Sequence, residues 1–260
     1  MLSHEPTIRL TAFLSVLALM ALLEALHPAR RREIPRLLRW SNNLALVAVD
    51  TVLVRLIFPF AAVGVAVWAQ GRGWGLLHAA PGWLAWPVAL LLLDLAIYAQ
   101  HIVFHYVPPL WRLHRLHHAD TEFDVTTGLR FHPGEILISF GFKLLVVLAL
   151  GPPPEAVLVF EVVLNATSMF NHSNLRLPVW LDRGLRWVTV TPDMHRVHHS
   201  VLPVETNSNF GFNLPWWDRL FGTYRAHPKA GQRGMTIGLD EFRDRREVWL
   251  WRMLTQPWRR

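Results

Sequence analysis

Long apolar segments, separated by short basic or turn-rich segments, fill the first two thirds of the chain. The first runs from residue 8 to residue 26, the second from about 44 to 69, and the third from about 83 to 107. None of them shows the regular polar positions of a surface helix. Each is long enough to cross the hydrocarbon core of a bilayer, so we expect three transmembrane helices.

A fourth apolar region is interrupted by a Gly-Pro-Pro-Pro turn at residues 151–154, which separates residues 136–150 from residues 155–170. Consecutive prolines cannot continue a helix, so this pattern predicts a short transmembrane hairpin. The fold class expected is an all-α integral membrane protein. It has about four to five apolar spans, namely three long spans plus the short hairpin.

The chain becomes more polar after about residue 174, where Trp and Phe alternate with Arg and with turn signals such as Thr-Pro-Asp. This pattern predicts a helical cap on the membrane face. We therefore expect one membrane-embedded domain over residues 1–260. It is divided into N-terminal spans (1–82), a histidine-rich region (83–227) and a basic C-terminal tail (228–260).

Composition and charge agree with a membrane location. Hydrophobic residues make up 52% of the chain and charged residues 17%, with a formal net charge of +7. Because most of the chain lies in lipid, this basic excess predicts contact with lipid headgroups and argues against nucleic acid. The absence of cysteine excludes disulfides, cysteine-ligated iron–sulfur clusters and thiol catalysis.

The basic residues also predict an orientation. Among the Lys and Arg residues, only Arg9 and Arg72 lie on the predicted outer side, and Arg55 and Lys143 lie within the spans. All others lie in residues 27–42, residues 108–135 or the region after His172. Positive residues favour the cytoplasmic side, so we expect a multi-pass protein whose histidine-rich segments face the cytoplasm. The short termini and compact loops favour a bacterial inner membrane.

Histidines are grouped in a way that predicts a metal site. The spaced groups are His101 and His105; His114, His117 and His118; and His195, His198 and His199. Spacings of three and four residues place side chains on one face of a helix. His172 ends the hairpin at the same membrane level. We expect Arg115 and Leu116, between the histidines, to point away from that face and to tolerate substitution.

Imidazole nitrogens suit iron, zinc, copper and nickel, and so many ligands fit two metals better than one. Two redox metals beside a membrane indicate oxygen chemistry on a lipid. Zinc would instead indicate a membrane lipid hydrolase, although no His-Glu-x-x-His motif is present. A metal transporter or sensor is a third alternative, which predicts ligands along the transmembrane path.

The histidine groups, set among four spans, resemble those of the fatty acid hydroxylase/sterol desaturase superfamily. Further stretches carry the same resemblance: RFHPGE (residues 130–135), FNHSN (170–174) and TPDMHRVHHS, which begins the segment 191–224. The resemblance covers about residues 91–224.

This resemblance implies a non-haem di-iron oxygenase that uses O2 to hydroxylate or desaturate an unactivated C–H bond of a membrane lipid. Electrons would come from a separate donor, a reductase with a ferredoxin or cytochrome, because no cytochrome-like domain is fused to the chain. The family's metal-ligand positions correspond to His101, His105, His114, His117, His118, His172, His195, His198 and His199.

Four other residues are candidates for the surroundings of the metals. His132 matches a family histidine and either binds metal or supports the site. Asp94 either orients a histidine ring or forms an ion pair with Arg55 or Lys143. Asn209 and Asp218 are expected to act as supporting groups.

Overall fold

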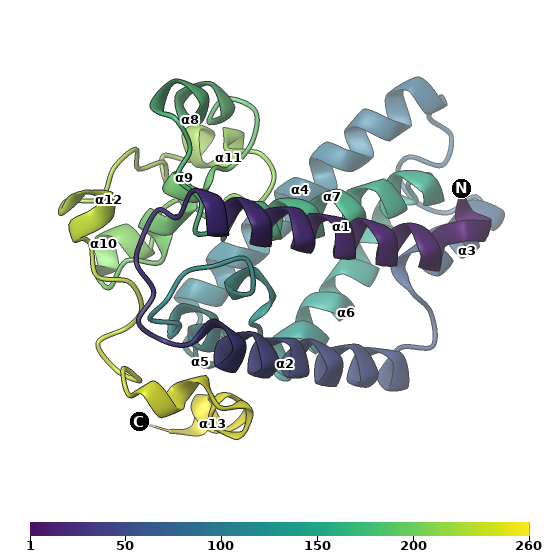
Figure 1. Cartoon of the computed structure of the whole chain (residues 1–260). Helices are drawn as coiled ribbons and strands as arrows, with labels where there is room; N and C mark the ends of the chain where they lie inside the picture. The colour runs from purple at the N-terminus through teal and green to yellow at the C-terminus, as the bar shows by residue number, and fades with distance from the viewer. Residues whose placement is uncertain (260) are drawn as a thin grey trace.

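The computed structural model describes residues 1–259, which fold into helices joined by short loops (Figure 1). Within this range, β-structure is limited to two isolated bridges, Pro28 with Leu175 and Ser200 with Ile237. The long helices are α1 (Glu5–Leu26), α2 (Arg36–Ile57), α3 (Ala62–Gly71), α4 (Gly82–Tyr106), α5 (Pro108–His118), α6 (Pro133–Leu150) and α7 (Pro154–Asn171). The expected all-α fold class is confirmed.

Four helical segments are long and apolar enough to cross a membrane: Leu2–Leu26, Arg36–Gly71, Gly82–Tyr106 and Pro133–Leu150. Large apolar side chains such as Leu10, Leu14 and Leu22 are more than half exposed along α1. Apolar side chains on the outside of a helix bundle are suited to lipid tails. The protein is therefore a multi-pass membrane protein, as the first and third apolar segments predict.

The second apolar segment differs from the expected single span over residues 44–69. The helix begins earlier, at Arg36, and ends at Ile57. A separate helix, α3, begins at Ala62 and packs against α6 and α7. Pro59 accounts for the break, because proline lacks a backbone N–H and disfavours helical geometry in the residue before it. Residues 36–42 consequently belong to α2 and not to a loop.

The predicted hairpin is confirmed in its position. Helices α6 and α7 are joined by a turn in which Gly151 has a φ of +55°. A side chain at Gly151 would lie 2.0 Å from the carbonyl oxygen of Trp74, so this turn has room only for glycine. The turn is also held by Leu77, whose backbone N–H donates to the carbonyl of Leu150 at 2.8 Å.

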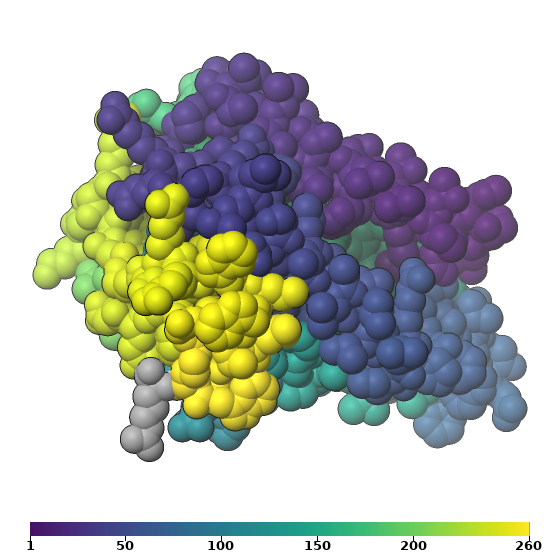
Figure 2. Space-filling view, turned by 60° about the horizontal axis from the view of Figure 1, so that its bottom comes forward, coloured from purple at the N-terminus to yellow at the C-terminus, as the bar shows by residue number. Residues whose placement is uncertain are grey.

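Helix α1 packs on α7 and helix α2 packs on α6. A hollow separates α1 from α2 and α3 in the space-filling view, and atoms from the middle of the chain form its floor (Figure 2). This arrangement leaves a lateral opening between two membrane-spanning helices.

The region after His172 forms the expected cap from short helices at one end of the bundle (Figure 1). These are α8 (Val179–Leu185), α9 (Pro192–His198), α10 (Pro203–Thr206), α11 (Trp216–Leu220), α12 (Gly231–Gly234) and α13 (Leu250–Thr255). Single 3-10 turns lie at Leu2–His4, Thr127–Leu129, Arg245–Val248 and Gln256–Trp258. The C-terminal segment lies against α2 and α5.

The expected tolerance of Arg115 and Leu116 to substitution is not supported. Leu116 is completely buried in a small core with Leu46 and Met253. Arg115 donates to the carbonyl of Gln256 at 2.8 Å. The face of α5 that points away from the histidines therefore packs against α2 and the C-terminal segment and is not free.

Candidate metal centre

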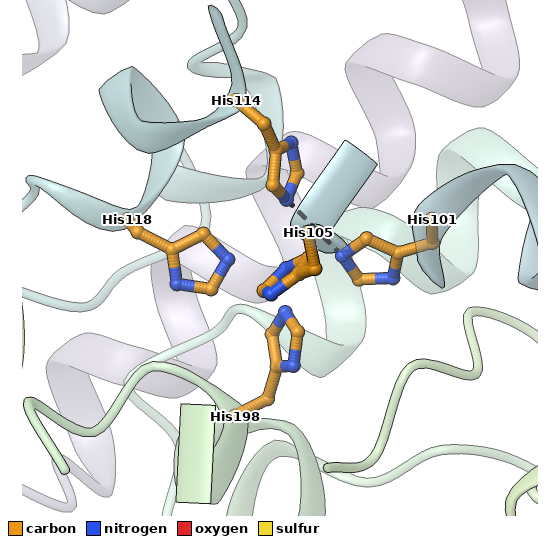
Figure 3. Close-up of side chains that lie close together, drawn as sticks. All are labelled: His101, His105, His114, His118 and His198. Carbon is orange, nitrogen blue, oxygen red and sulfur yellow. Dashed lines mark hydrogen bonds between the residues drawn. The ribbon is translucent and has the colours of Figure 1, made fainter. Parts of the chain in front are cut away.

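Nine histidines from four parts of the chain converge in two adjacent groups. The five-histidine group contains His101, His105, His114, His118 and His198, which Figure 3 shows with their rings pointing toward one another. The four-histidine group contains His117, His172, His195 and His199. Within each group, one nitrogen of every ring lies within 4.8 Å of the others. All nine residues predicted from the sequence are thus brought together.

The two H-x-x-H-H motifs are each divided between the groups. On α5, His114 and His118 belong to the five-histidine group and His117 to the other. On α9, His195 and the following His199 belong to the four-histidine group, whereas His198 belongs to the first. On one face of a helix, residues i+3 and i+4 are displaced in opposite directions around the helix axis from residue i, so neighbouring rings can point to different groups. Each motif therefore serves both groups.

Backbone carbonyls fix the orientation of three of the rings. His101 Nδ1 donates to the carbonyl of Phe210 at 2.8 Å, and His198 Nδ1 donates to that of Ser208 at 2.7 Å. His172 Nδ1 donates to the carbonyl of Ser168 at 2.7 Å. A carbonyl can only accept, so Nδ1 carries the proton and Nε2 presents a lone pair.

Two side chains that the sequence predictions missed act in the same way. Glu135 Oε1 lies 2.6 Å from His114 Nδ1, and Asn207 Oδ1 lies 3.1 Å from His105 Nδ1. Glu135 lies in the RFHPGE stretch, where an acidic residue at the start of a transmembrane helix was the available signal. Such partners orient an imidazole and increase its basicity toward a metal.

Nε2 atoms of several rings approach one another closely inside the two groups. His101 Nε2 and His114 Nε2 are 3.1 Å apart, and His172 Nε2 lies 3.0 Å from the Nε2 atoms of His117 and His195. With the proton of His101 and of His114 on Nδ1, two lone pairs confront each other in the first of these contacts. Among residues 1–259, Nε2 of His105, His118 and His198 is buried without any partner. This donor set fits bound cations that prefer nitrogen, such as iron or zinc.

Burial keeps the rings neutral. It lowers the pKa of His114 and of His172 to about 3. It also lowers, well below the ordinary value, the pKa of His117, His118, His195, His198 and His199. Neutral imidazole is the form that binds metals, so both groups are in the ligand form at neutral pH.

Asn209 lies in the loop between α10 and α11, and Asp218 lies in α11. Both were expected as supporting groups, and neither forms a hydrogen bond with a histidine. The Asn209 amide donates to the carbonyls of Met194 and Arg225 at 2.8 and 2.9 Å. Asp218 accepts from the backbone N–H of Phe210 at 2.7 Å. They hold the loop whose carbonyls orient His101 and His198.

His132 lies outside both histidine groups. Its Nδ1 accepts from the N–H of Gly134 at 3.0 Å, and its Nε2 donates to the carbonyl of Leu254 at 3.1 Å. Both ring nitrogens are therefore engaged in capping α6 and in fixing the C-terminal segment. The alternative of a ligand is not supported, and the role of His132 is to place the helix that carries Glu135.

Asp94 forms neither of the two expected contacts in the structure. Its carboxylate accepts from Trp217 Nε1 at 2.8 Å and from the backbone N–H of Leu214 at 3.3 Å. The expected partner Lys143 binds Glu161 instead. Trp217 is far from Asp94 in the sequence and lies in the cap, so the local sequence did not reveal this contact.

A buried polar cluster places the loop between α5 and α6. Arg39 of α2 forms ion pairs with Asp120, at 2.5 Å, and with Asp124. Glu24 of α1 accepts from the backbone N–H groups of Val125 and Asn174, each at 2.7 Å. This cluster ties the segments that carry His118 and His172 to the first two transmembrane helices.

A cavity of about 760 Å³ adjoins the five-histidine group, reaching His101 and His114. It lies between α1, α2, α4, α6 and α7, and it includes the opening between α1 and α2 (Figure 2). Phe58, Phe140 and Phe212 are among the residues that line it. Its size is that of cavities that bury much of a small ligand.

Comparison with known proteins places this centre in a family. The fatty acid hydroxylase family model matches residues 86–223. Ornithine lipid hydroxylase OlsE of Rhizobium tropici is 29% identical over 86% of this chain and 69% of its own length. Cholesterol 25-hydroxylase of Rattus norvegicus is 32% identical over 55% of this chain and 47% of its own length.

Alkylglycerol monooxygenase of Homo sapiens is 27% identical over 68% of this chain. The chain spans about half the length of the cholesterol 25-hydroxylase and 38% of that of the human monooxygenase. No solved structure gives a significant match. The matched region contains all nine histidines of the two groups, and the chain belongs to the fatty acid hydroxylase family.

Proposed function

We propose that the protein is a membrane-bound lipid hydroxylase in which the nine histidines hold two iron ions. The observation that carries this proposal is the position of the two buried histidine groups beside a cavity that opens between membrane-spanning helices. Iron bound there would supply the activation of O2 and the oxidation of a C–H bond. Electrons would come from a separate reductase with a ferredoxin or cytochrome.

The residues of the chain have distinct tasks in this proposal. Carbonyls of Phe210, Ser208 and Ser168 and the carboxylate of Glu135 hold protons on Nδ1, so that Nε2 faces the metal. The ring of Phe131 stacks on His117 at 4.5 Å and excludes water from that side of the centre. The lateral opening admits a membrane lipid without passage through water.

The named activities of the relatives favour hydroxylation over desaturation, since each is a hydroxylase or a monooxygenase. The alternatives of a zinc hydrolase and of a metal transporter or sensor gain no support from these relatives. The distribution of Lys and Arg supports a cytoplasmic position of the histidine groups, and we propose the inner membrane of a bacterium as the location.

The decisive experiment combines metal analysis with lipid mass spectrometry. Protein purified from iron-replete cells should hold about two iron ions per chain, the number of histidine groups. Lipids of cells expressing it should gain one oxygen, whereas desaturation would remove two hydrogens. His117→Ala and His198→Ala, one from each group, should abolish the product. His227→Ala, an exposed histidine outside both groups, is the matched control. Stoichiometric zinc without iron, or oxidation that persists in the double variant, would refute the proposal.

A further inference from the structure

The cavity beside the five-histidine group contains polar oxygens whose hydrogen-bonding capacity is unused. Asp50 of α2, Gln100 of α4 and Glu135 of α6 all line it. Asp50 Oδ1, Gln100 Oε1 and Glu135 Oε2 are buried without a hydrogen-bond partner among residues 1–259. The unused atoms are all oxygens, and the carboxylate and amide oxygens of these residues accept hydrogen bonds.

Asp50 is the least explained of the three. Its side chain is 7% exposed, and no hydrogen bond or ion pair joins it to any other described residue. The neighbouring acids are different: Glu161, on the same cavity, pairs with Arg9 at 2.6 Å and with Lys143. An acidic residue within a membrane helix is costly unless it is paired or faces a polar ligand.

Two of the unused acceptors lie beside the histidines. Glu135 uses its other oxygen to bind His114, and Gln100 directly precedes His101 in α4. Phe58 lies eight residues after Asp50, about 12 Å farther along the axis of α2. Its ring packs against that of Phe140, with ring centroids 5.0 Å apart. The cavity thus has acceptor oxygens beside the histidines, and aromatic side chains such as Phe58, Phe140 and Phe212 also line it.

These unpaired oxygens restrict which part of a lipid can lie beside the histidines. A hydrocarbon chain there would displace water and leave three buried oxygens without partners, which costs free energy. A group with hydroxyl or protonated amine donors would satisfy them, while the attached hydrocarbon would contact the aromatic walls.

We propose that the cavity receives the polar, hydrogen-bond-donating part of a lipid with Asp50 as its principal partner, so that the carbon oxidised lies beside that polar part and not in mid-chain. The statement about the oxidised carbon rests on the proposed function. The statement about binding does not, because it concerns only the cavity and its oxygens.

Three probes of equal chain length test the binding: dodecanol, dodecylamine and dodecane. Each is titrated into the detergent-solubilised full-length protein, and the shift of the thermal unfolding midpoint gives its affinity. Dodecanol or dodecylamine should stabilise the protein, and dodecane should not. Asp50→Leu should weaken binding of the polar probe by about 10-fold, the size expected for a lost hydrogen bond. Glu155→Gln, which removes an acid from the outer end of α7, should leave this affinity unchanged.

Asp50→Asn separates the two donor chemistries, because it keeps an acceptor oxygen and loses the charge. The Asp50→Asn variant should retain dodecanol binding, and it should bind dodecylamine more weakly than the native protein if the natural group is an amine. If Asp50→Leu does not fold, Gln100→Leu provides the second test. Equal stabilisation by dodecane and the polar probes in the native protein would overturn the proposal.

Tandem mass spectrometry of the cellular lipid product then locates the added oxygen. Oxygen beside the polar group supports the proposal, and oxygen in the middle of an acyl chain overturns it. A protein that binds the polar probes but oxidises nothing would refute the proposed function while leaving the binding inference standing.

Discussion

The contact between Glu135 and His114 allows the metal assignment to be tested at one of the two groups. Glu135 is 5% exposed, and its Oε1 lies 2.6 Å from His114 Nδ1. Glu135→Gln preserves the shape of the side chain and replaces the carboxyl group with an amide. His114 would keep an oxygen that accepts from Nδ1, but it would lose the more basic carboxyl partner that strengthens Nε2 as a ligand.

The magnitude follows from the kind of bond. Changing the hydrogen-bond partner of a metal-bound histidine typically lowers metal affinity by about 10- to 100-fold, which is about 1.4–2.8 kcal/mol. The iron affinity of the five-histidine group should therefore fall by roughly 10- to 100-fold. The four-histidine group does not contain His114 and should keep its iron.

The assay is the iron content per chain as a chelator is titrated into the purified protein. Glu135→Gln should lose one of two ions at chelator concentrations that the native protein tolerates. Asp94→Asn is the matched control, since this buried acid of a membrane helix binds Trp217 and no histidine. The reasoning is refuted if Glu135→Gln keeps both ions as tightly as the native protein. It is also refuted if Asp94→Asn loses iron equally readily.

Two further predictions concern stability, measured by denaturant unfolding in detergent. Leu116→Ala should cost about 2–5 kcal/mol because Leu116 is fully buried, whereas the exposed neighbour Arg112→Ala should change stability by less than about 0.5 kcal/mol. Equal effects of the two would contradict the packing of α5. Arg39→Met should cost about 3–5 kcal/mol because it leaves the carboxylates of Asp120 and Asp124 buried without their cation. Adding Asp120→Asn and Asp124→Asn to Arg39→Met should restore part of the loss, and no restoration would argue against the ion pairs.

The helices and the nine histidines could be predicted because each depends on local sequence. Apolar length defines α1 and α4, and spacing of three and four residues places histidines on one face of α5. The division of each motif between two groups was not predicted. It depends on which side of α5 meets α9, and residues far apart in the sequence determine that contact.

The same physical reason explains the errors at single residues. Leu116 was expected to be free because the sequence does not show that Met253 of the C-terminal segment packs beside it. Asp94 was expected to bind a histidine, Arg55 or Lys143, whereas its partner Trp217 comes from the cap. Pro59 was visible in the sequence, and the break after α2 could have been predicted from it.

The division of the motifs between the two groups also determines when the centre can be assembled during biosynthesis. A nascent chain that has reached only α5 lacks His198 from one group, and His172, His195 and His199 from the other. Both groups become complete only after α9 has been synthesised and has docked beside α5. Under the proposed function, a chain that ends before α9 therefore cannot provide either complete histidine group for a metal ion.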